Sequence, residues 1–203
     1  MRDFLETSHF DTARLPMVER FSAWRESMDV VFDVSAHDES TRDDFSARVD
    51  SVLLDDIAIN HCRLSAQTLR RDPARIARDG LDHYQLHVFL AGSVEMECGG
   101  RVVNARPGDF VNLDHGEPVC SRTTDYEIVN LFIPRRRLGP LLYTPDSLHG
   151  VVFDSRSGAG RLLRDYVTSL NRAAREITLD QASQAAEALT QLAALALNRE
   201  GPD

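Results

Sequence analysis

The sequence contains no lysine, and all 23 of its basic residues are arginines. Acidic residues number 32, so the formal net charge at pH 7 is −9. Binding to DNA phosphates requires a basic surface, and the sequence also lacks a helix-turn-helix pattern. Both absences argue against direct DNA binding by this chain.

Cysteine is scarce as well. The three cysteines are odd in number, widely spaced and without a C-x-x-C pair, namely Cys62, Cys98 and Cys120. This pattern argues against a disulfide framework or a zinc knuckle and favours reduced thiols that act as small buried hydrophobes. No apolar run approaches the length of a membrane span, and acids among the first residues do not fit a secretory signal. We therefore expect a cytoplasmic protein.

Motifs of common catalytic sites are missing too. The sequence has no G-x-S-x-G nucleophile elbow, no phosphate-binding loop and no dinucleotide fingerprint. Its 203 residues, with an apolar fraction of 42% and no low-complexity tract, are nevertheless ample for a globular core. The chain is therefore expected to fold, but without a recognisable catalytic motif.

The chain is organised around residues 80–134. Apolar and polar residues alternate through residues 83–88, which predicts a strand with two unlike faces. Turns that contain glycine or proline follow at short intervals, and β-rich runs lie between them at residues 93–98, 101–105, 110–114 and 126–133. Short strands joined by tight turns, with no helical period between them, predict antiparallel hairpins that close into a sandwich or barrel.

The preceding residues predict an arm, a helix and more strands. Residues 1–16 are polar and predict a loose arm, whereas residues 18–28 carry apolar side chains at helical spacing. Trp24 on this helix is interpreted as packing against the barrel, with stacking on a ligand as the alternative. Further strands are predicted at residues 30–34, 45–54 and 57–69. The total of about eight strands suits a small barrel whose interior holds one ligand.

The C-terminal third is helical in pattern. Residues 160–174 and 179–198 each predict a helix, and the second is rich in Ala and Leu along one stripe. An apolar stripe shows only that something covers it, so packing within the chain and contact with a second copy both remain possible. Residues 199–203 break the helix and are interpreted as a linker stub.

Two sets of motifs resemble known families. Gly92, the G-G-R turn at 99–101 and the P-G-D turn at 107–109, with Phe110 and His115, resemble the cupin fold, a small β-barrel. A longer frame consists of R-D-G-L-D-H-Y at 78–84, P-G-D-F at 107–110 and I-P-R at 133–135. This frame, with the R-F-x-x-W-R-E helix at 20–26, resembles the effector-binding domain of AraC-type bacterial transcription regulators.

The resemblance implies a mainly β fold with C-terminal helices. Residues 1–134 would form a cupin-like antiparallel barrel with an N-terminal arm and helix, residues 135–198 a helical dimerisation segment, and residues 199–203 a linker stub. The resemblance further implies a homodimer that binds a small-molecule effector and contacts DNA only through a domain outside this chain. Whether such a domain was removed or never present is left open.

The strand at residues 83–88 supplies the first candidate ligand-binding residues. His83, Gln85 and His87 share one face of this strand, and Tyr84, Leu86 and Val88 share the other. If the polar face points into the barrel, it offers the few convergent hydrogen-bonding groups that a small-molecule pocket needs. If it points outward, the histidines are surface residues and the pocket is apolar. Asn112 is a further candidate for the same pocket.

An arginine cluster supplies the second set of candidates. Four arginines lie between residues 70 and 78, and a guanidinium matches a carboxylate or phosphate, so Arg71 and Arg75 are candidate contacts for an anionic effector. The R-x-x-x-R spacing also loosely resembles the paired arginines of PilZ-type cyclic-dinucleotide receptors, although the D/N-x-S-x-x-G strand of that family is missing. The alternative is a solvated connection whose arginines pair with the surplus acids.

A metal site is not expected. Metal-dependent cupin enzymes usually hold the ion with two His two residues apart, a Glu and a later His. Here His83 and His87 are four residues apart on a strand, which separates their backbones by about 13 Å. Gln85 stands between them, and only His115 has the place of the late His. We expect no cofactor and no enzyme activity.

The sequence therefore predicts the effector-sensing and dimerisation domain of an AraC-type regulator. A small molecule would enter the barrel, order the arm or a barrel loop, and shift how attached DNA-binding domains are presented. The alternatives are a metal-dependent cupin enzyme with a degenerate site and a cyclic-dinucleotide receptor that uses Arg71 and Arg75.

Overall fold

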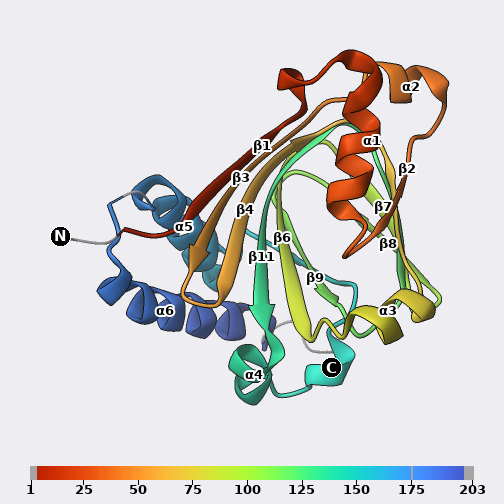
Figure 1. Ribbon diagram of the computed structural model, residues 1–203. Helices are drawn as coiled ribbons and strands as arrows, with labels where there is room; N and C mark the ends of the chain where they lie inside the picture. Colours follow the sequence, from red (N-terminus) through yellow and green to blue (C-terminus); the bar gives the residue numbers. More distant parts are fainter. Residues whose placement is uncertain (1–3, 175, 199–203) are drawn as a thin grey trace.

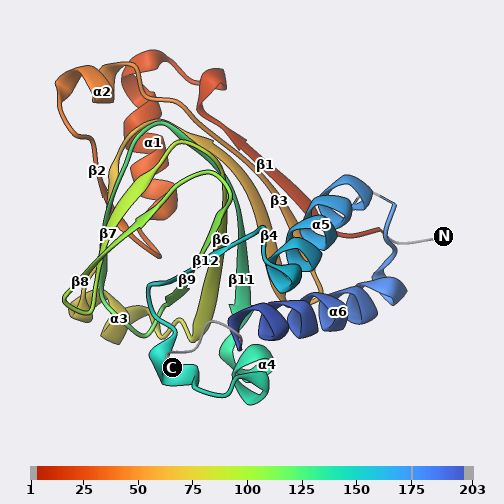
Figure 2. The ribbon, with the colours of Figure 1, turned by 180° about the vertical axis from the view of Figure 1, so that it is seen from behind.

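The computed structural model describes residues 4–174 and 176–198, which fold into two antiparallel β-sheets and a pair of long C-terminal helices (Figures 1 and 2). The larger sheet has seven strands in the order β1 (Thr7–Asp11), β3 (Ala47–Leu54), β4 (Ile57–Leu64), β11 (Tyr126–Pro134), β6 (His83–Ala91), β9 (Asp109–Asp114) and β12 (Val151–Asp154). The smaller has five, in the order β2 (Asp33–Ser35), β5 (Thr68–Arg71), β10 (Val119–Thr123), β7 (Val94–Cys98) and β8 (Arg101–Ala105).

Within the described residues, six α-helices join and cover the sheets. They are α1 (Met17–Met28), α2 (Glu39–Asp43), α3 (Pro73–Asp79), α4 (Arg135–Leu138), α5 (Gly158–Ala173) and α6 (Leu179–Leu197). Pro73 begins α3, and Gly80 ends it in the left-handed conformation, at a φ of +62°. Among the described residues, no helix is both long and apolar enough to span a membrane.

The two faces of the seven-stranded sheet are covered by different partners. Its inner face packs against the five-stranded sheet and α1, forming a core that includes Trp24, Phe45 and Phe89. Its outer face packs against α5 and α6, forming a second core that includes Tyr84 and Leu189. Figure 2 shows the two helices side by side along this outer face. Successive side chains of each strand point to opposite faces of the sheet, so they pack alternately in the inner core and in the outer core.

The predicted fold class is confirmed, with differences in detail. The sheets form a cupin-like arrangement that does not close, because no strand of one sheet pairs with a strand of the other in the described part of the chain. Residues 4–174 and 176–198 contain twelve strands, where about eight were expected. The predicted strand at 57–69 is two strands, β4 and β5, and the acidic loop before β3 contains the short helix α2.

Two predicted segments take a different form. Residues 7–11 of the expected loose arm pair with β3 as the edge strand β1, and the rest of the arm includes residues outside the described part. The predicted linker stub at 199–203 also lies outside the described residues. The helical segment after residue 134 contributes the strand β12, which pairs with β9, so it shares both sheet and core with the barrel.

Candidate functional site

A cavity of about 290 Å³ lies between the two sheets and beneath α1. Strands of both sheets form its walls, and α1 with the segment that follows it closes one side. Most of the lining is aromatic or aliphatic, and none of the lining side chains is Asp, Glu, Lys or Arg. A concave, mostly apolar space with a few polar groups is the usual form of a small-molecule site.

Three polar side chains lie in one row across neighbouring strands of the seven-stranded sheet and face the cavity. Asn130 of β11 stands opposite Asn60 of β4 on one side and opposite His87 of β6 on the other. All three line the cavity. Asn60 Nδ2 donates to Asn130 Oδ1 at 2.9 Å, and Asn130 Nδ2 lies 3.7 Å from the sulfur of Cys62. We call Asn60, Asn130 and His87 the polar row.

His87 is the unsatisfied member of the polar row. Its side chain has no hydrogen bond to any described residue, and its Nε2 is shielded from solvent. The ring lies stacked against Phe89, with 6.2 Å between ring centroids. Burial lowers the pKa of His87 from 6.5 to about 4, because the imidazolium would lose its hydration. At neutral pH the cavity therefore holds a neutral imidazole that can still form hydrogen bonds.

Gln85 lies beside the polar row, and its side chain already has a hydrogen-bond partner. A hydrogen bond of 2.8 Å joins its Oε1 to Nε2 of His115, which is itself buried between Phe32 and Phe132. Burial, with the nearby guanidinium of Arg71, lowers the pKa of His115 from 6.5 to about 3. Gln85 therefore connects the cavity wall to a neutral histidine behind it.

The opposite end of the cavity is fixed by a chain of buried hydrogen bonds. Trp24 Nε1 donates to Gln67 Oε1 at 2.7 Å, and Gln67 Nε2 donates to the Tyr126 hydroxyl at 3.0 Å. Trp24 belongs to the inner core, where its ring lies near Phe45, and it also lines the cavity. The packing role predicted for Trp24 is thus observed, and the same ring is in reach of a guest.

The structure separates the residues that the sequence grouped on the strand at 83–88. Gln85 and His87 point into the cavity, whereas Tyr84, Leu86 and Val88 enter the outer core, so the polar face is the inner one. His83 is at the start of β6 and is not among the lining residues. Asn112 lies on the opposite face of β9, where its Nδ2 donates to the Leu148 carbonyl at 3.0 Å. Alternation along β9 places Leu113 in the cavity instead.

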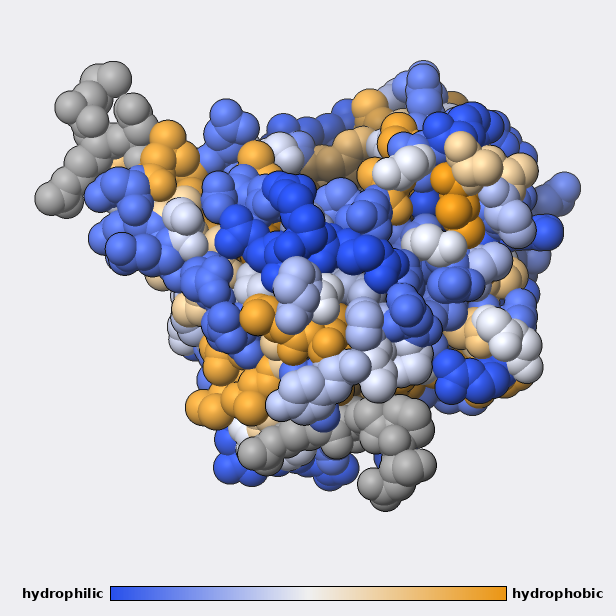
Figure 3. All heavy atoms as spheres, turned by 90° about the horizontal axis from the view of Figure 1, so that it is seen from below, coloured by the Kyte–Doolittle hydropathy of each residue, from blue (hydrophilic) through white to orange (hydrophobic). Residues whose placement is uncertain are grey.

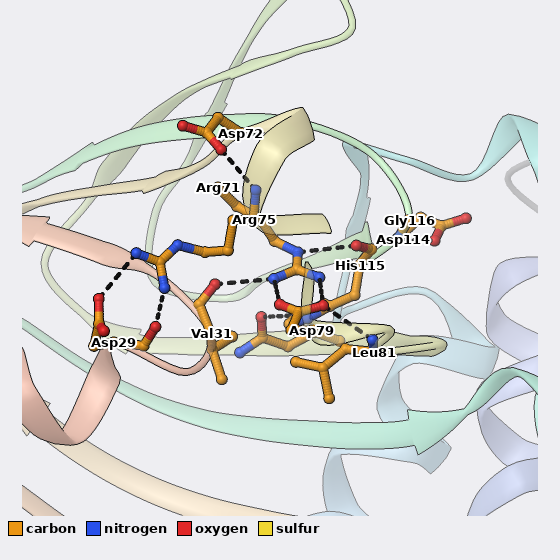
Figure 4. A network of polar contacts seen from close by, with 11 residues as sticks. Asp29, Val31, Arg71, Asp72, Arg75, Asp79, Leu81, Asp114, His115 and Gly116 are labelled. Atoms are coloured by element: carbon orange, nitrogen blue, oxygen red, sulfur yellow. Dashed lines mark hydrogen bonds and ion pairs between the residues drawn. The ribbon is translucent and has the colours of Figure 1, made fainter. Parts of the chain in front are cut away.

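None of the described arginines lines the cavity. Figure 4 shows the polar contacts that Arg71 and Arg75 make instead. The Arg71 side chain is 1% exposed and is held by both carboxylate oxygens of Asp79, at 2.5 and 2.9 Å. It donates further to the carbonyls of Val31 and His115. Arg75 pairs with Asp29. The pairing with surplus acids is therefore what the structure shows for both arginines, and it ties β5 and α3 to the segment after α1, whose Val31 lines the cavity.

The described residues contain no cluster of three or more His, Cys, Asp or Glu side chains that could hold a metal ion. The only titratable side chains in the cavity wall are His87, Cys62 and Tyr126. Burial raises the pKa of the Cys62 thiol to about 12, so it is not a nucleophile at neutral pH. Burial also raises the pKa of Tyr126. The wall thus has hydrogen-bonding groups but no charged acid or base.

Sequence reasoning missed Asn60 and Asn130. A signal was present, since Asn130 is the one polar residue in the apolar run from 128 to 133. A buried amide in such a run must find partners, which marks a polar contact on one strand face. The row itself could not be read from the sequence, because it depends on the register between strands that are 70 residues apart.

Comparison with known proteins supports the fold and gives a family. The sequence model of the AraC-binding-like domain family matches residues 24–198. The AraC-like transcriptional activator CuxR superposes with a TM-score of 0.90 at 23% identity, over 98% of this chain and 72% of that chain. The EutQ protein of Clostridium difficile gives a TM-score of 0.36 at 13% identity, over 48% of this chain and 79% of that chain. Ectoine synthase from P. lautus gives a TM-score of 0.35 at 21% identity, over 43% of this chain and 64% of that chain. No curated protein matches this sequence.

Proposed function

The chain belongs to the AraC-binding-like domain family, and from this premise we propose that it senses a small-molecule effector for an AraC-type transcription regulator in the cytoplasm. The observation that carries the proposal is the mostly apolar cavity between the sheets, with an imidazole in its wall that has no hydrogen-bond partner among the described residues. Gln85 and His87 are the predicted contact residues that this cavity contains. The acidic surplus argues against DNA contact by this chain itself, so the proposal assigns any DNA contact to a separate domain.

Binding without conversion is the form of the proposal that the cavity favours. A hydrolytic or redox site needs a nucleophile, an acid-base pair or a metal, and the lining offers neutral amides, hydroxyls and one neutral imidazole. The arginines proposed for a cyclic dinucleotide are held by Asp79 and Asp29. Neither alternative gains an observation in its favour.

The proposed signal leaves the cavity through the segment after α1. Val31 and Phe32 line the cavity, and the Val31 carbonyl accepts a hydrogen bond of 3.0 Å from Arg71. A guest that moves this segment would therefore disturb the contacts of Arg71 and, through it, α3. Such a shift requires that the guest bind the two arrangements with different affinity.

The proposed homodimer would use surfaces of α5 and α6 that the fold leaves free. The predicted stripe on α6 is buried within the chain, since Ala182, Ala186 and Leu189 pack in the outer core. Exposed apolar side chains remain at Leu162 on α5 and at Leu179 and Leu195 on α6. Figure 3 shows hydrophobic patches among hydrophilic residues on the face seen from below. Light scattering on wild type and Leu195→Glu tests the dimer: a monomer at all concentrations in the wild type contradicts it.

The test of effector sensing blocks the cavity. Ser121 of β10 lines it, so Ser121→Phe fills part of the space, whereas the exposed Ser8 of β1 serves as the matched control in Ser8→Phe. A compound library is screened for a rise in the unfolding midpoint, because a ligand that binds only the folded state raises stability. We expect effectors to stabilise the wild type and Ser8→Phe but not Ser121→Phe. Stabilisation that persists in Ser121→Phe would place the effector elsewhere, and chemical turnover of the compound would overturn sensing.

A further inference from the structure

The charge of the cavity restricts what can enter it. No lining side chain carries a charge, and the buried guanidinium of Arg71 already has Asp79 as its partner. A carboxylate or ammonium that entered would lose its hydration and find no opposite charge. The imidazole of His87 cannot supply one at neutral pH, because burial keeps its pKa well below the usual value.

The polar row sets the hydrogen bonds that a guest can make. Asn60 and Asn130 already bond to each other, and His87 has no partner among the described residues. A neutral imidazole has one donor and one acceptor nitrogen, so a hydroxyl, which both donates and accepts, suits either tautomer. The next inward-facing residues on the same three strands are apolar. Ile128 of β11 stands opposite Cys62 of β4 and opposite Phe89 of β6.

The size of the cavity limits the apolar body of the guest. An engineered apolar cavity of about 150 Å³ holds a benzene molecule. This cavity has about 290 Å³. It therefore suits a guest of about ten to twelve non-hydrogen atoms, on the same scale.

We propose that the cavity takes an uncharged molecule with a compact apolar body and one hydroxyl-bearing edge, and that this edge pairs with His87 in the polar row. This inference rests on the proposed sensing function and replaces the anionic effector that Arg71 and Arg75 suggested. It names the chemical class of the effector, not the compound.

The test uses probes that share one apolar body. 4-tert-Butylphenol carries a hydroxyl, 4-tert-butyltoluene carries none, and 4-tert-butylbenzoate and 4-tert-butylbenzylammonium are ions at pH 7. Binding is measured by calorimetry and by the fluorescence of Trp24, the chain's only tryptophan, which lines the cavity. We expect the phenol to bind at one site per chain and both ions to bind at least about 100-fold more weakly.

Variants test the pairing with His87. His87→Leu is expected to weaken the phenol about tenfold, the usual effect of one lost hydrogen bond, and to leave 4-tert-butyltoluene unchanged or tighter. Asn130→Leu provides a second variant at the centre of the row, with the same expectation. His61→Leu is the matched control, because His61 lies on the other face of β4, paired with Glu127, and should change neither probe.

The outcomes separate this inference from the proposed function. If an ion binds as tightly as the phenol and Ser121→Phe abolishes its binding, the sensing function stands and the uncharged class is wrong. If none of the four probes binds, the uncharged, hydroxyl-bearing class is wrong, and the library screen on wild type and Ser121→Phe decides the sensing function separately. If the phenol binds equally well to wild type, His87→Leu and Asn130→Leu, the role of the polar row is wrong.

Discussion

At the scale of single residues, His87 is the side chain whose surroundings matter most. The strand pattern placed it on the same face as Gln85, and the structure shows that this face is the inner one. Its lack of a partner could not be foreseen, because the partners of a buried group come from other strands. A buried imidazole without a partner costs stability once it must be protonated.

This cost predicts how stability depends on pH. The pKa of His87 is about 4 in the folded protein and 6.5 in the unfolded chain. Between these values the unfolded state binds more protons, so acid should destabilise the fold progressively as pH falls from 6.5 towards 4. The full contribution of His87 is about 3 kcal/mol. Urea unfolding of wild type and His87→Leu at pH 7 and pH 4.5 checks this, and we expect the variant to lose less stability. Equal losses in the two proteins would contradict a buried, neutral His87.

Arg71 offers a second prediction at this scale. Asp79→Asn removes the counter-charge of a guanidinium that is 1% exposed and should cost about 3–5 kcal/mol of unfolding free energy. The control is Asp29→Asn, since Asp29 is 69% exposed in its pair with Arg75 and should cost less than about 1 kcal/mol. Chemical denaturation of both variants measures the difference. Similar small losses would show that Arg71 is not fixed by Asp79.

At the scale of elements, the turn between β6 and β7 depends on Gly92. Its φ is +75°, and a Cβ there would lie 2.7 Å from the Cβ of Tyr126, a residue of the cavity wall. Gly99, between β7 and β8, has a φ of +56° with open space around it. Both favour glycine for their backbone, but only Gly92 is also crowded.

Two alanine substitutions separate these effects. Gly99→Ala should cost about 1 kcal/mol, the penalty of a left-handed backbone alone. Gly92→Ala adds a steric overlap with β11 and should cost more than about 3 kcal/mol. Thermal unfolding of the two variants gives the comparison. A Gly92→Ala protein as stable as Gly99→Ala would mean that the turn can shift away from β11.

The elements also show how far the sequence leads. The predicted strands at 101–105 and 126–133 and the helices α1, α5 and α6 follow from periodicity and turn residues, and the structure confirms them within a few positions. Three strands were missed: β1, β10 and β12. The inward side chains of β10 include Ser121 and Thr123, so it lacks an apolar alternation, and β12 has only four residues. The polar row needs the register of distant strands, which local pattern does not contain.

At the scale of the molecule, the barrel and the C-terminal helices share one core. Leu189 of α6 and Tyr84 of β6 belong to the same buried cluster, on the outer face of the sheet whose inner face lines the cavity. The division at residue 134 that the resemblance implied therefore separates parts that are packed together. We expect them to unfold as one cooperative unit.

A substitution on α6, which covers the outer face of the sheet, tests whether the helices and the barrel unfold together. Leu189→Ala should lower stability by about 2–5 kcal/mol, because Leu189 is fully buried. The Trp24 fluorescence transition, which reports the inner core, should move by the same amount as the helical circular dichroism. Gln184→Ala, at an exposed polar position of α6, is the control and should move neither signal much. Separate transitions for the two signals would contradict a single unit.

The most direct measurement is a crystal structure of the chain soaked with 4-bromophenol, in which anomalous scattering locates the bromine. We expect one bromine peak between the two sheets, among the apolar side chains, with the phenol hydroxyl at His87 in the polar row. A bromine peak only outside the two sheets, for instance beside Arg71 and Arg75, would contradict the assignment of the cavity as the effector site.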